Sequence, residues 1–198
     1  MAMNRLTKVL AVSAAMGTAL IVAGCQLTRA GYESAAYRME SKAKHFEIRI
    51  YDELALVSTP MEGTSEKADG SSFMRLFRYI SGDNAGQQKI AMTTPVFMNE
   101  GDEKTMSFVL PEEVTAEGVP AGNDRLVSVG SLVSGRYAVL RLKGARSDAK
   151  VANGKQALAL WIAGQGLRSA GDYLVAGYDP PFTPGFAQRN EVLVRLAE

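Results

Sequence analysis

The chain has 198 residues, of which 22 are Lys or Arg, 21 are Asp or Glu and one is His. This length is enough for one domain of ordinary size with a buried core. The near balance of charge argues against a nucleic-acid-binding protein, because such proteins usually carry a basic excess. A single histidine also argues against a metal site built from several histidines.

The first 24 residues have the pattern of an export signal. A short basic start, with Arg5 and Lys8, precedes an apolar stretch of 13 residues from Val9 to Ile21. That stretch is too short to span a hydrocarbon core, which needs about 20 residues. The next four residues, Val-Ala-Gly-Cys, resemble the bacterial lipobox, in which a peptidase cleaves before the cysteine and the cysteine carries the lipid. We therefore expect residues 1–24 to be a lipoprotein signal peptide and Cys25 to be lipidated.

Cys25 is the only cysteine, so the exported chain is expected to form no internal disulfide. Two or three acyl chains, palmitate among them, would make its attachment to a membrane effectively permanent. By resemblance to the enterobacterial sorting pattern, Gln26 in place of Asp favours the outer membrane. The alternative is an ordinary secretory signal or an uncleaved anchor. We expect a lipid-anchored protein of the bacterial cell envelope, with residues 25–43 as lipidated N-terminus and tether and residues 44–198 as the domain.

Hydrophobic patterns divide the domain into two halves with the same order of elements. Apolar and charged residues alternate at the start of the first half, which predicts a strand. After a polar break at 63–70, apolar residues recur at i, i+3, i+4 and i+7, which predicts a helix. The first half is expected to hold strands at 46–50 and 54–61, a helix from Ser71 or Ser72 to Gly82, and strands at 89–98 and 105–110.

A long polar connection at 111–124 leads to the second half, which repeats the order strand-strand-helix-strand-strand. Its elements are expected at 126–129, 136–142, 147–164, 173–178 and 191–196, the third of these being the helix. Strands that follow one another through short turns pair antiparallel, and helices then cover the sheet. The predicted fold class is therefore α+β with an antiparallel sheet.

Three segments resemble the SOUL/heme-binding protein family. They are FEIRIY at 46–51, SSFMRLFRYISGDNAGQQKIAMTTPV at 71–96 followed by MSFVLP, and AGYDPPFTPGFAQRNEVLVRL at 176–196. The resemblance implies a distorted antiparallel β-barrel of two similar strand-strand-helix-strand-strand halves, with one helix packed on each. Related folds include bacterial effector-binding domains that hold varied small molecules, so the fold alone does not name the ligand.

The resemblance also implies that heme or a related tetrapyrrole binds in an open apolar groove beside the first helix. A macrocycle with two carboxylates needs aromatic and apolar walls and a cation at the rim. The candidate ligand-binding residues are Phe73, Met74, Phe77, Arg78 and, from a proline-rich lip, Phe182. In the alternative interpretation, the two helical phenylalanines belong to the apolar stripe that faces the core.

Ligation of the heme iron is a separate question. His45 is the only imidazole, and it precedes the first strand, where an exposed histidine is the ordinary outcome. We therefore assign no metal ligand and keep His45 as the alternative. A thioether can also ligate heme iron, although such side chains ordinarily fill gaps in a core. Five methionines form an apolar surface rich in thioethers: Met61, Met74, Met92, Met98 and Met106.

The sequence carries no GxSxG or HExxH motif, and acylation of Cys25 leaves no cysteine for catalysis, so an enzyme is not expected. Arg189, Asn190 and Glu191 are expected to make buried hydrogen bonds that hold the last strand. The predicted function is non-enzymatic, envelope-anchored binding of heme or a related tetrapyrrole, as a buffer or carrier. The alternatives are a structural or interaction lipoprotein without a ligand, and a sensor of another amphipathic small molecule.

Overall fold

The computed structural model describes residues 31–61, 65–99, 101, 103–180 and 182–198, without the side chains of residues 65–70. Residues 33–198 form one compact unit, and the description below concerns this unit. The predicted signal peptide and Cys25 lie outside the described residues. No helix among the described residues is long and apolar enough to cross a membrane.

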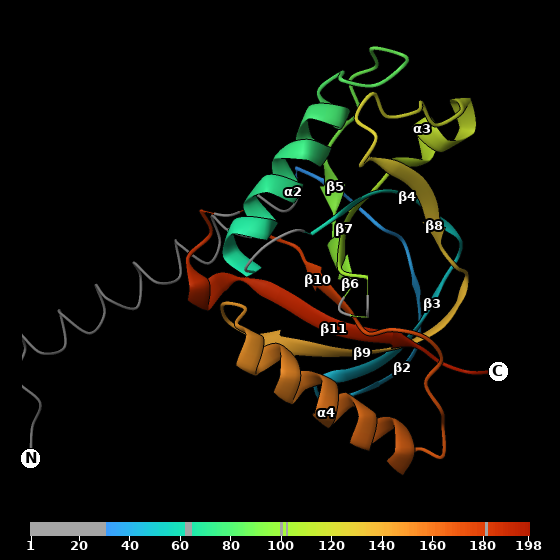
Figure 1. Ribbon diagram of the computed structural model, residues 1–198. Coiled ribbons are helices and arrows are strands. Elements are labelled where there is room, and N and C mark those ends of the chain that lie inside the picture. The colour runs from blue at the N-terminus through green and yellow to red at the C-terminus, as the bar shows by residue number, and fades with distance from the viewer. Residues whose placement is uncertain (1–30, 62–64, 100, 102, 181) are drawn as a thin grey trace, which may run out of the picture. The chain divides into compact units, whose positions relative to one another are not determined.

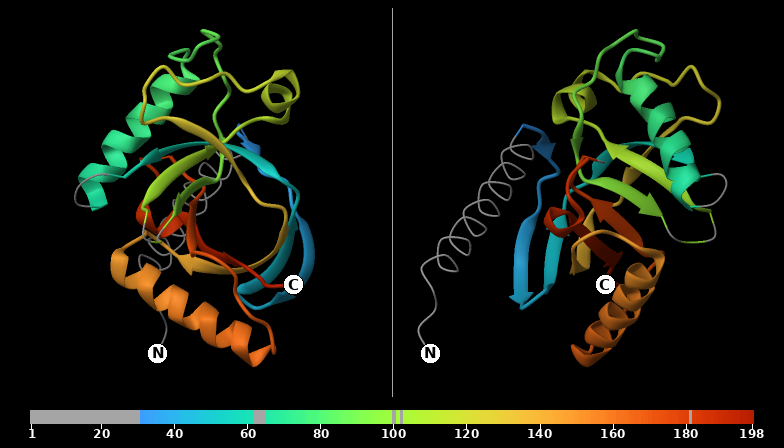
Figure 2. Two further views of the ribbon diagram at one scale, coloured as in Figure 1. Left: turned by 45° about the vertical axis from the view of Figure 1, so that its right-hand side comes forward. Right: turned by 90° about the vertical axis from the view of Figure 1, so that its left-hand side faces the viewer.

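Nine of the described strands form one large antiparallel sheet in the order β2-β3-β9-β11-β10-β6-β7-β4-β8 (Figure 1). β2 and β8 are the edges of this order, and Figure 2 shows the sheet curving strongly around its concave face. The sheet is thus curved like a barrel, with two edges. The strand bounds are β2 Arg38–Ala43, β3 Phe46–Tyr51, β4 Leu54–Pro60, β6 Val96–Asn99, β7 Thr105–Val109, β8 Ser128–Leu132, β9 Gly135–Lys143, β10 Leu174–Gly177 and β11 Arg189–Arg195.

A short parallel strand pair and several helices complete this unit. The pair consists of β1 (Glu33–Ser34) and β5 (Thr93–Thr94). The helices are α2 (Ser65–Ile80), α3 (Glu112–Glu117), α4 (Asp148–Gly164) and the 3-10 turn η1 (Gly185–Ala187). Ser147 caps the N-terminus of α4, where its side chain accepts a hydrogen bond from the Lys150 amide.

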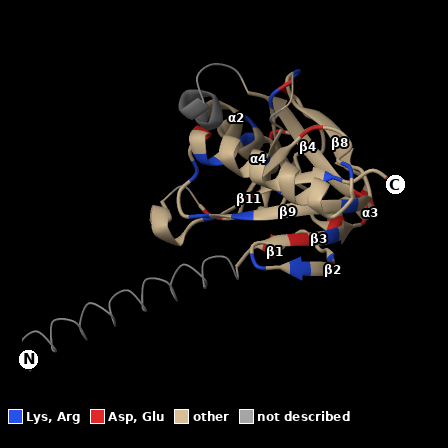
Figure 3. Ribbon diagram, turned by 90° about the horizontal axis from the view of Figure 1, so that it is seen from below, with Lys and Arg blue, Asp and Glu red and all other residues tan. Residues whose placement is uncertain are grey.

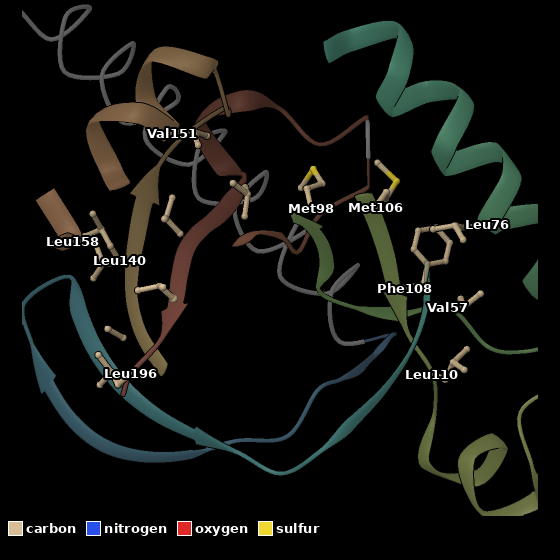
Figure 4. Close-up of a cluster of buried hydrophobic side chains, with 14 of the residues drawn as sticks. Val57, Leu76, Met98, Met106, Phe108, Leu110, Leu140, Val151, Leu158 and Leu196 are labelled. Atoms are coloured by element: carbon tan, nitrogen blue, oxygen red, sulfur yellow. The ribbon is translucent and has the colours of Figure 1, made fainter. Parts of the chain in front are cut away.

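The convex face of the sheet packs against α4 and α2. Alternating apolar residues of β9 and β11 belong to the same buried cluster as the apolar residues of α4: Ala138, Leu140, Val192, Val194, Val151, Leu158 and Ile162. The α2 residues Leu76, Tyr79 and Ile80 belong to this cluster with Val57 and Phe108. Figure 4 shows part of this cluster, with Val151 and Leu158 of α4 on one side and Leu76 of α2 on the other.

The concave face has its own apolar cluster. It contains Tyr51 of β3, Phe97 of β6, Tyr137 of β9 and Leu193 of β11, each at most 3% exposed. Successive residues of a strand point to opposite faces, so the residues between these positions face the helices. The two clusters explain why the central strands are apolar on both faces.

The predicted fold class is confirmed. The unit is α+β, and each half contributes two strands, one long helix and two more strands in the expected order, namely β3, β4, α2, β6 and β7, then β8, β9, α4, β10 and β11. Within the segment predicted as one strand at 89–98, the structure has two short strands. Pro95, which has no amide hydrogen to donate, lies between them.

The sequence interpretation differs from the structure in three segments. Residues 38–43, assigned to the tether, form β2, an exposed edge strand whose polar residues give no apolar alternation. The polar break predicted at 63–70 includes the first turns of α2, which begins at Ser65. The connection at 111–124 contains α3, in which Val114 is the buried residue. β2 and α3 bury too little apolar surface to produce a periodic pattern, and the segment 65–70 has a single apolar residue, Ala68.

Candidate functional site: an apolar groove beside α2

A groove of about 500 Å³ lies on the convex side of the sheet, beside α2. Ligand pockets for small molecules are commonly about 300–1,000 Å³. Phe73 and Met74 of α2 line it, and Val96, Met98 and Met106 line it from β6 and β7. The remaining lining residues come from the segments around β10, β11 and the start of α4: Arg146, Gly177, Asp179, Pro180, Gln188 and Asn190.

The strands β6 and β7 supply apolar side chains to this groove because of their register. Met98 pairs with Met106 across the two antiparallel strands, so both side chains project from the same face. Figure 4 shows them side by side, projecting in the same direction. Only 5% of Met98 and 4% of Met106 is exposed, so these residues join the groove to the core.

The wall formed by α2 is held in place by aromatic contacts. The ring of Phe73 lies 5.3 Å from that of Phe108 in an edge-to-face arrangement, and 6.1 Å from that of Phe77 in a stacked one. The same helix is tied to β4 by two hydrogen bonds: Ser72 Oγ to the Pro60 carbonyl at 2.9 Å, and Arg75 Nη1 to Thr59 Oγ1 at 2.9 Å.

Arg146 gives the groove a cationic group. It lies in the loop between β9 and α4, directly before the helix cap Ser147, and its Nη1 donates to the Met98 sulfur. Burial lowers the pKa of Arg146, and the charge of Asp148 opposes this effect. An arginine side chain nevertheless remains protonated at neutral pH. Positive charge therefore lies directly beside an apolar surface, which suits a ligand that carries both an apolar body and an anionic group.

The predicted ligand-binding residues fall into two groups. Phe73 and Met74 line the groove. Phe77 stacks on Phe73 outside the lining and is 43% exposed. The side chain of Arg78 is 58% exposed, with Nη2 3.9 Å from Asp124 Oδ2. Phe182 lies in the loop after β10 and is 79% exposed.

Sequence reasoning missed Arg146 because the residue belongs to a short loop without a pattern. The only local signal was its position next to a helix-capping serine. Gln188 and Asn190, at the other side of the groove, were also missed as lining residues. The Gln188 side-chain amide donates a hydrogen bond of 3.0 Å to the Thr183 carbonyl, and the Asn190 side-chain amide donates one of 3.2 Å to the Gly144 carbonyl.

His45 lies in the exposed turn between β2 and β3 and is not a lining residue of the groove. Its carbonyl accepts a hydrogen bond of 3.0 Å from the Arg141 amide, which fixes the turn to β9. Across the described part of the chain, no group of three or more His, Cys, Asp or Glu residues is arranged to hold a metal ion.

The concave face contains a buried network of charges, separate from the groove. Glu47 and Arg49 of β3 and Glu191 of β11 form its centre, and none of these three residues is exposed. Tyr178 donates a hydrogen bond of 3.0 Å to Glu191, and Arg189 Nη2 donates another of 2.8 Å. The predicted buried hydrogen bonds at the start of the last strand are thereby confirmed. Because these groups pair with one another, the network is suited to holding β3 and β11 together.

A second cavity of about 250 Å³ lies near β1 and the β3–β4 turn. Its lining includes the carboxyl groups of Glu33, Asp52, Glu53 and Glu112. Four carboxylates would repel an anionic ligand. Compared with this cavity, the groove beside α2 is therefore better suited to a tetrapyrrole, whose carboxylates require a cation, because its described lining has Arg146 and a single carboxylate, Asp179.

The curved antiparallel sheet and its two covering helices define an α+β domain, and the groove with apolar walls and a cation is its candidate ligand site. The sequence model of the family described as "SOUL heme-binding protein" matches residues 32–195. The chain therefore belongs to the SOUL heme-binding protein family.

The chain is also similar to two frog proteins named Heme-binding protein 1. It is 26% identical to the protein of Xenopus tropicalis and 24% identical to that of Xenopus laevis, each over 156 residues. Each match covers 74% of this chain and 81% of the frog protein.

Solved structures show the same fold at much lower sequence identity. The EcmrR C-terminal domain aligns with a TM-score of 0.51 at 12% identity, over 82% of this chain and 98% of that domain. An uncharacterized conserved protein from Listeria innocua aligns with a TM-score of 0.53 at 11% identity, over 79% of this chain and 94% of its own. At this identity the likeness establishes the fold alone.

Proposed function

We propose that the protein reversibly binds heme or a related tetrapyrrole in the groove beside α2. The position of Arg146 carries the proposal, because its guanidinium lies at an otherwise largely apolar groove of about 500 Å³. A tetrapyrrole presents a flat apolar macrocycle and carboxylate side chains, so it needs both kinds of surface. Membership of the SOUL heme-binding protein family and the names of the frog relatives support the same class of ligand.

Each part of the groove has a separate role in this proposal. Phe73 and Met74 contact the macrocycle from the helix, Met98 and Met106 contact it from the sheet, and Arg146 pairs with a carboxylate. The aromatic and thioether groups supply dispersion contacts that adapt to a planar ligand. The groove is open to solvent along α2, which favours reversible binding by a buffer or carrier. No covalent step is involved, and the protein acts without catalysis.

The same proposal places the domain at the bacterial cell envelope, most simply the outer membrane, through acylated Cys25. β1 begins at Glu33, eight residues after that cysteine. Eight extended residues span at most about 29 Å, so the anchor would keep the start of the domain within that distance of the lipid surface. In the bacterium that carries the gene, wild-type protein should sediment with membranes and yield an acylated N-terminal peptide by mass spectrometry. The Cys25→Ser variant should do neither. Equal sedimentation of both proteins would contradict the anchor.

Binding can be tested with residues 26–198, which include the whole compact unit 33–198. Hemin and metal-free protoporphyrin IX are titrated and followed by absorbance, and each is expected to saturate at one per chain. Arg146→Gln removes a charge-assisted contact worth about 1.5–3 kcal/mol, which corresponds to a loss of affinity of roughly 10- to 150-fold.

Arg136→Gln is the matched control, because Arg136 pairs with Glu40 on the surface, at 2.6 Å. It should bind as the wild type does. Arg78→Gln should also have little effect, since Arg78 faces Asp124 and is not a lining residue. Absence of saturable binding of either porphyrin would contradict the proposed function. An equal loss in the Arg146 and Arg136 variants would contradict the assigned site.

A further inference from the structure

Three methionines from three different elements line the groove: Met74 of α2, Met98 of β6 and Met106 of β7. Neither His nor Cys is among the described lining residues. Among the side chains on this surface, thioether sulfur is the donor best suited to heme iron. The groove therefore has the means to recognise the metal as well as the macrocycle.

The two methionines on the sheet differ in what their sulfur atoms contact. The Met98 sulfur accepts a hydrogen bond from the Arg146 guanidinium. A metal cation at the same sulfur would be repelled by that positive charge. Met106 lies beside Met98 in register and projects in the same direction (Figure 4). The contact of Arg146 with the Met98 sulfur therefore leaves Met106 as the candidate metal ligand on the sheet.

The third methionine has a different environment. Met74 is 49% exposed on α2, whereas Met106 is only 4% exposed. A side chain with three rotatable bonds loses more conformational entropy when a half-exposed position becomes fixed than when a buried one does. Met106 is already held by the core cluster that contains Met98 and Phe108, so its sulfur is the better prepared ligand.

We propose that Met106 ligates the iron of heme bound in the groove, and that the site consequently prefers ferrous heme to ferric heme and to metal-free porphyrin. This inference rests on the proposed function. A thioether is a soft ligand, and soft ligands favour the lower oxidation state of a metal. Methionine ligation likewise raises the reduction potential of heme iron.

The test compares three ligands on the same chain, residues 26–198: hemin, heme reduced with dithionite, and metal-free protoporphyrin IX. Wild type should bind ferrous heme at least about tenfold more tightly than protoporphyrin, a difference of about 1.4 kcal/mol. Met106→Leu keeps a similar side-chain volume and removes the sulfur. Since Met106 also contacts the macrocycle, the readout is the ratio of the two affinities: this variant should bind ferrous heme no better than protoporphyrin, and it should show a shifted ferrous Soret band.

Met92→Leu is the matched control, because Met92 packs against the same core cluster without lining the groove. It should retain both the preference for ferrous heme and the Soret band of the wild type. Protoporphyrin binding by every variant would uphold the proposed function independently of iron. An unchanged ferrous preference in Met106→Leu would overturn the inference, and so would loss of that preference in Met74→Leu or Met98→Leu but not in Met106→Leu.

Discussion

The Arg49 guanidinium and the Glu191 carboxylate form an ion pair through two hydrogen bonds, which joins β3 to β11. The two residues are 142 positions apart in the sequence. Nη1 lies 2.6 Å from Oε2, and Nη2 lies 3.0 Å from Oε1. Nε of the same guanidinium donates a hydrogen bond of 2.9 Å to Glu47. Since these three side chains are at most 1% exposed, water does not solvate their charges, and each charge is stabilised by the opposite charges beside it.

Replacing Arg49 with Met is expected to lower the free energy of unfolding by about 3–5 kcal/mol, because it leaves buried carboxylates without their main cation. Figure 3 shows charged residues of both signs on β2 and β3, where Lys42 reaches Glu47 at 3.2 Å. Lys42→Met is therefore the control: its side chain is 54% exposed, and its loss should cost less than about 1 kcal/mol. Urea unfolding of the two variants measures the difference. Equal destabilisation would contradict the central role of Arg49.

The same network makes stability depend on pH in the acid range. Burial is the largest influence on the pKa of Glu191 and would raise it, but the hydrogen bonds and charges of Arg49 and Arg189 together outweigh burial and hold this pKa below its ordinary value. Burial would likewise raise the pKa of Glu47, and Arg49, Lys42 and Arg141 together lower it. A carboxyl group whose pKa is lower in the folded state stabilises the fold above its unfolded pKa, about 4.3. That stabilisation is lost as the pH falls through the folded-state value.

The free energy of unfolding should therefore be insensitive to these two groups near neutral pH and should fall below about pH 4.3. Glu191→Gln cannot take up this proton. Below about pH 4.3, its free energy of unfolding should therefore fall less steeply with decreasing pH than that of the wild type, by up to about 1.4 kcal/mol per pH unit, the effect of one proton. Glu198→Gln serves as the control, because that side chain is 95% exposed. Denaturant unfolding at a series of pH values measures the slopes. Parallel slopes for wild type and Glu191→Gln would show that the network does not control acid stability.

The fold was predictable where apolar residues repeat. The stripe of α4 and the alternation in β7 and β9 mark elements with one or two buried faces, and the structure has them within a few residues of the predicted bounds. β2 was not predictable in this way, because its six residues are all exposed and give no apolar alternation. Hydrophobic periodicity in a sequence reflects which side chains are buried, and an exposed edge strand buries few of them.

The site was predictable only in part, for a different reason. Phe73 and Met74 could be identified because they lie on a helix whose sequence resembles a known family. Arg146 reaches the groove through the return of the chain from β9 to α4, and Asn190 through the pairing of β11 with β10. These contacts depend on strand order, which no local sequence pattern encodes.

Asn84, in the turn after α2, should be unusually sensitive to substitution. This fully buried side chain donates to the Tyr79 carbonyl at 2.8 Å and to the Gln88 carbonyl at 2.7 Å. It also accepts hydrogen bonds from the Gly86 and Gln88 amides, at 3.2 and 3.0 Å. An amide can make all four bonds, whereas an ionised carboxylate can only accept.

Asn84→Asp is accordingly expected to lower the free energy of unfolding by about 3 kcal/mol at neutral pH, since two carbonyl groups lose their donor at about 1–3 kcal/mol each. Asn123→Asp is a suitable control, because Asn123 makes an exposed hydrogen bond to Asp83. Thermal unfolding distinguishes the two variants. A loss of less than about 1 kcal/mol in Asn84→Asp would mean that water replaces the missing donor.

Gly154 sets how closely α4 approaches the sheet. A Cβ atom at this position would lie 2.9 Å from Leu142 Cδ2 and 3.3 Å from Val192 Cγ2, both on strands under the helix. Gly154→Val should therefore destabilise the domain by about 1–3 kcal/mol through overpacking, although most residues favour a helix more than glycine does. Gly164→Ala, at the exposed end of the same helix with nothing within 4 Å of the added atom, should instead stabilise it by about 0.5–1 kcal/mol. Opposite shifts in the urea midpoint are the expected result. A stabilising effect of both substitutions would mean that α4 moves away from the sheet at little cost, and that the contact at Gly154 does not fix its position.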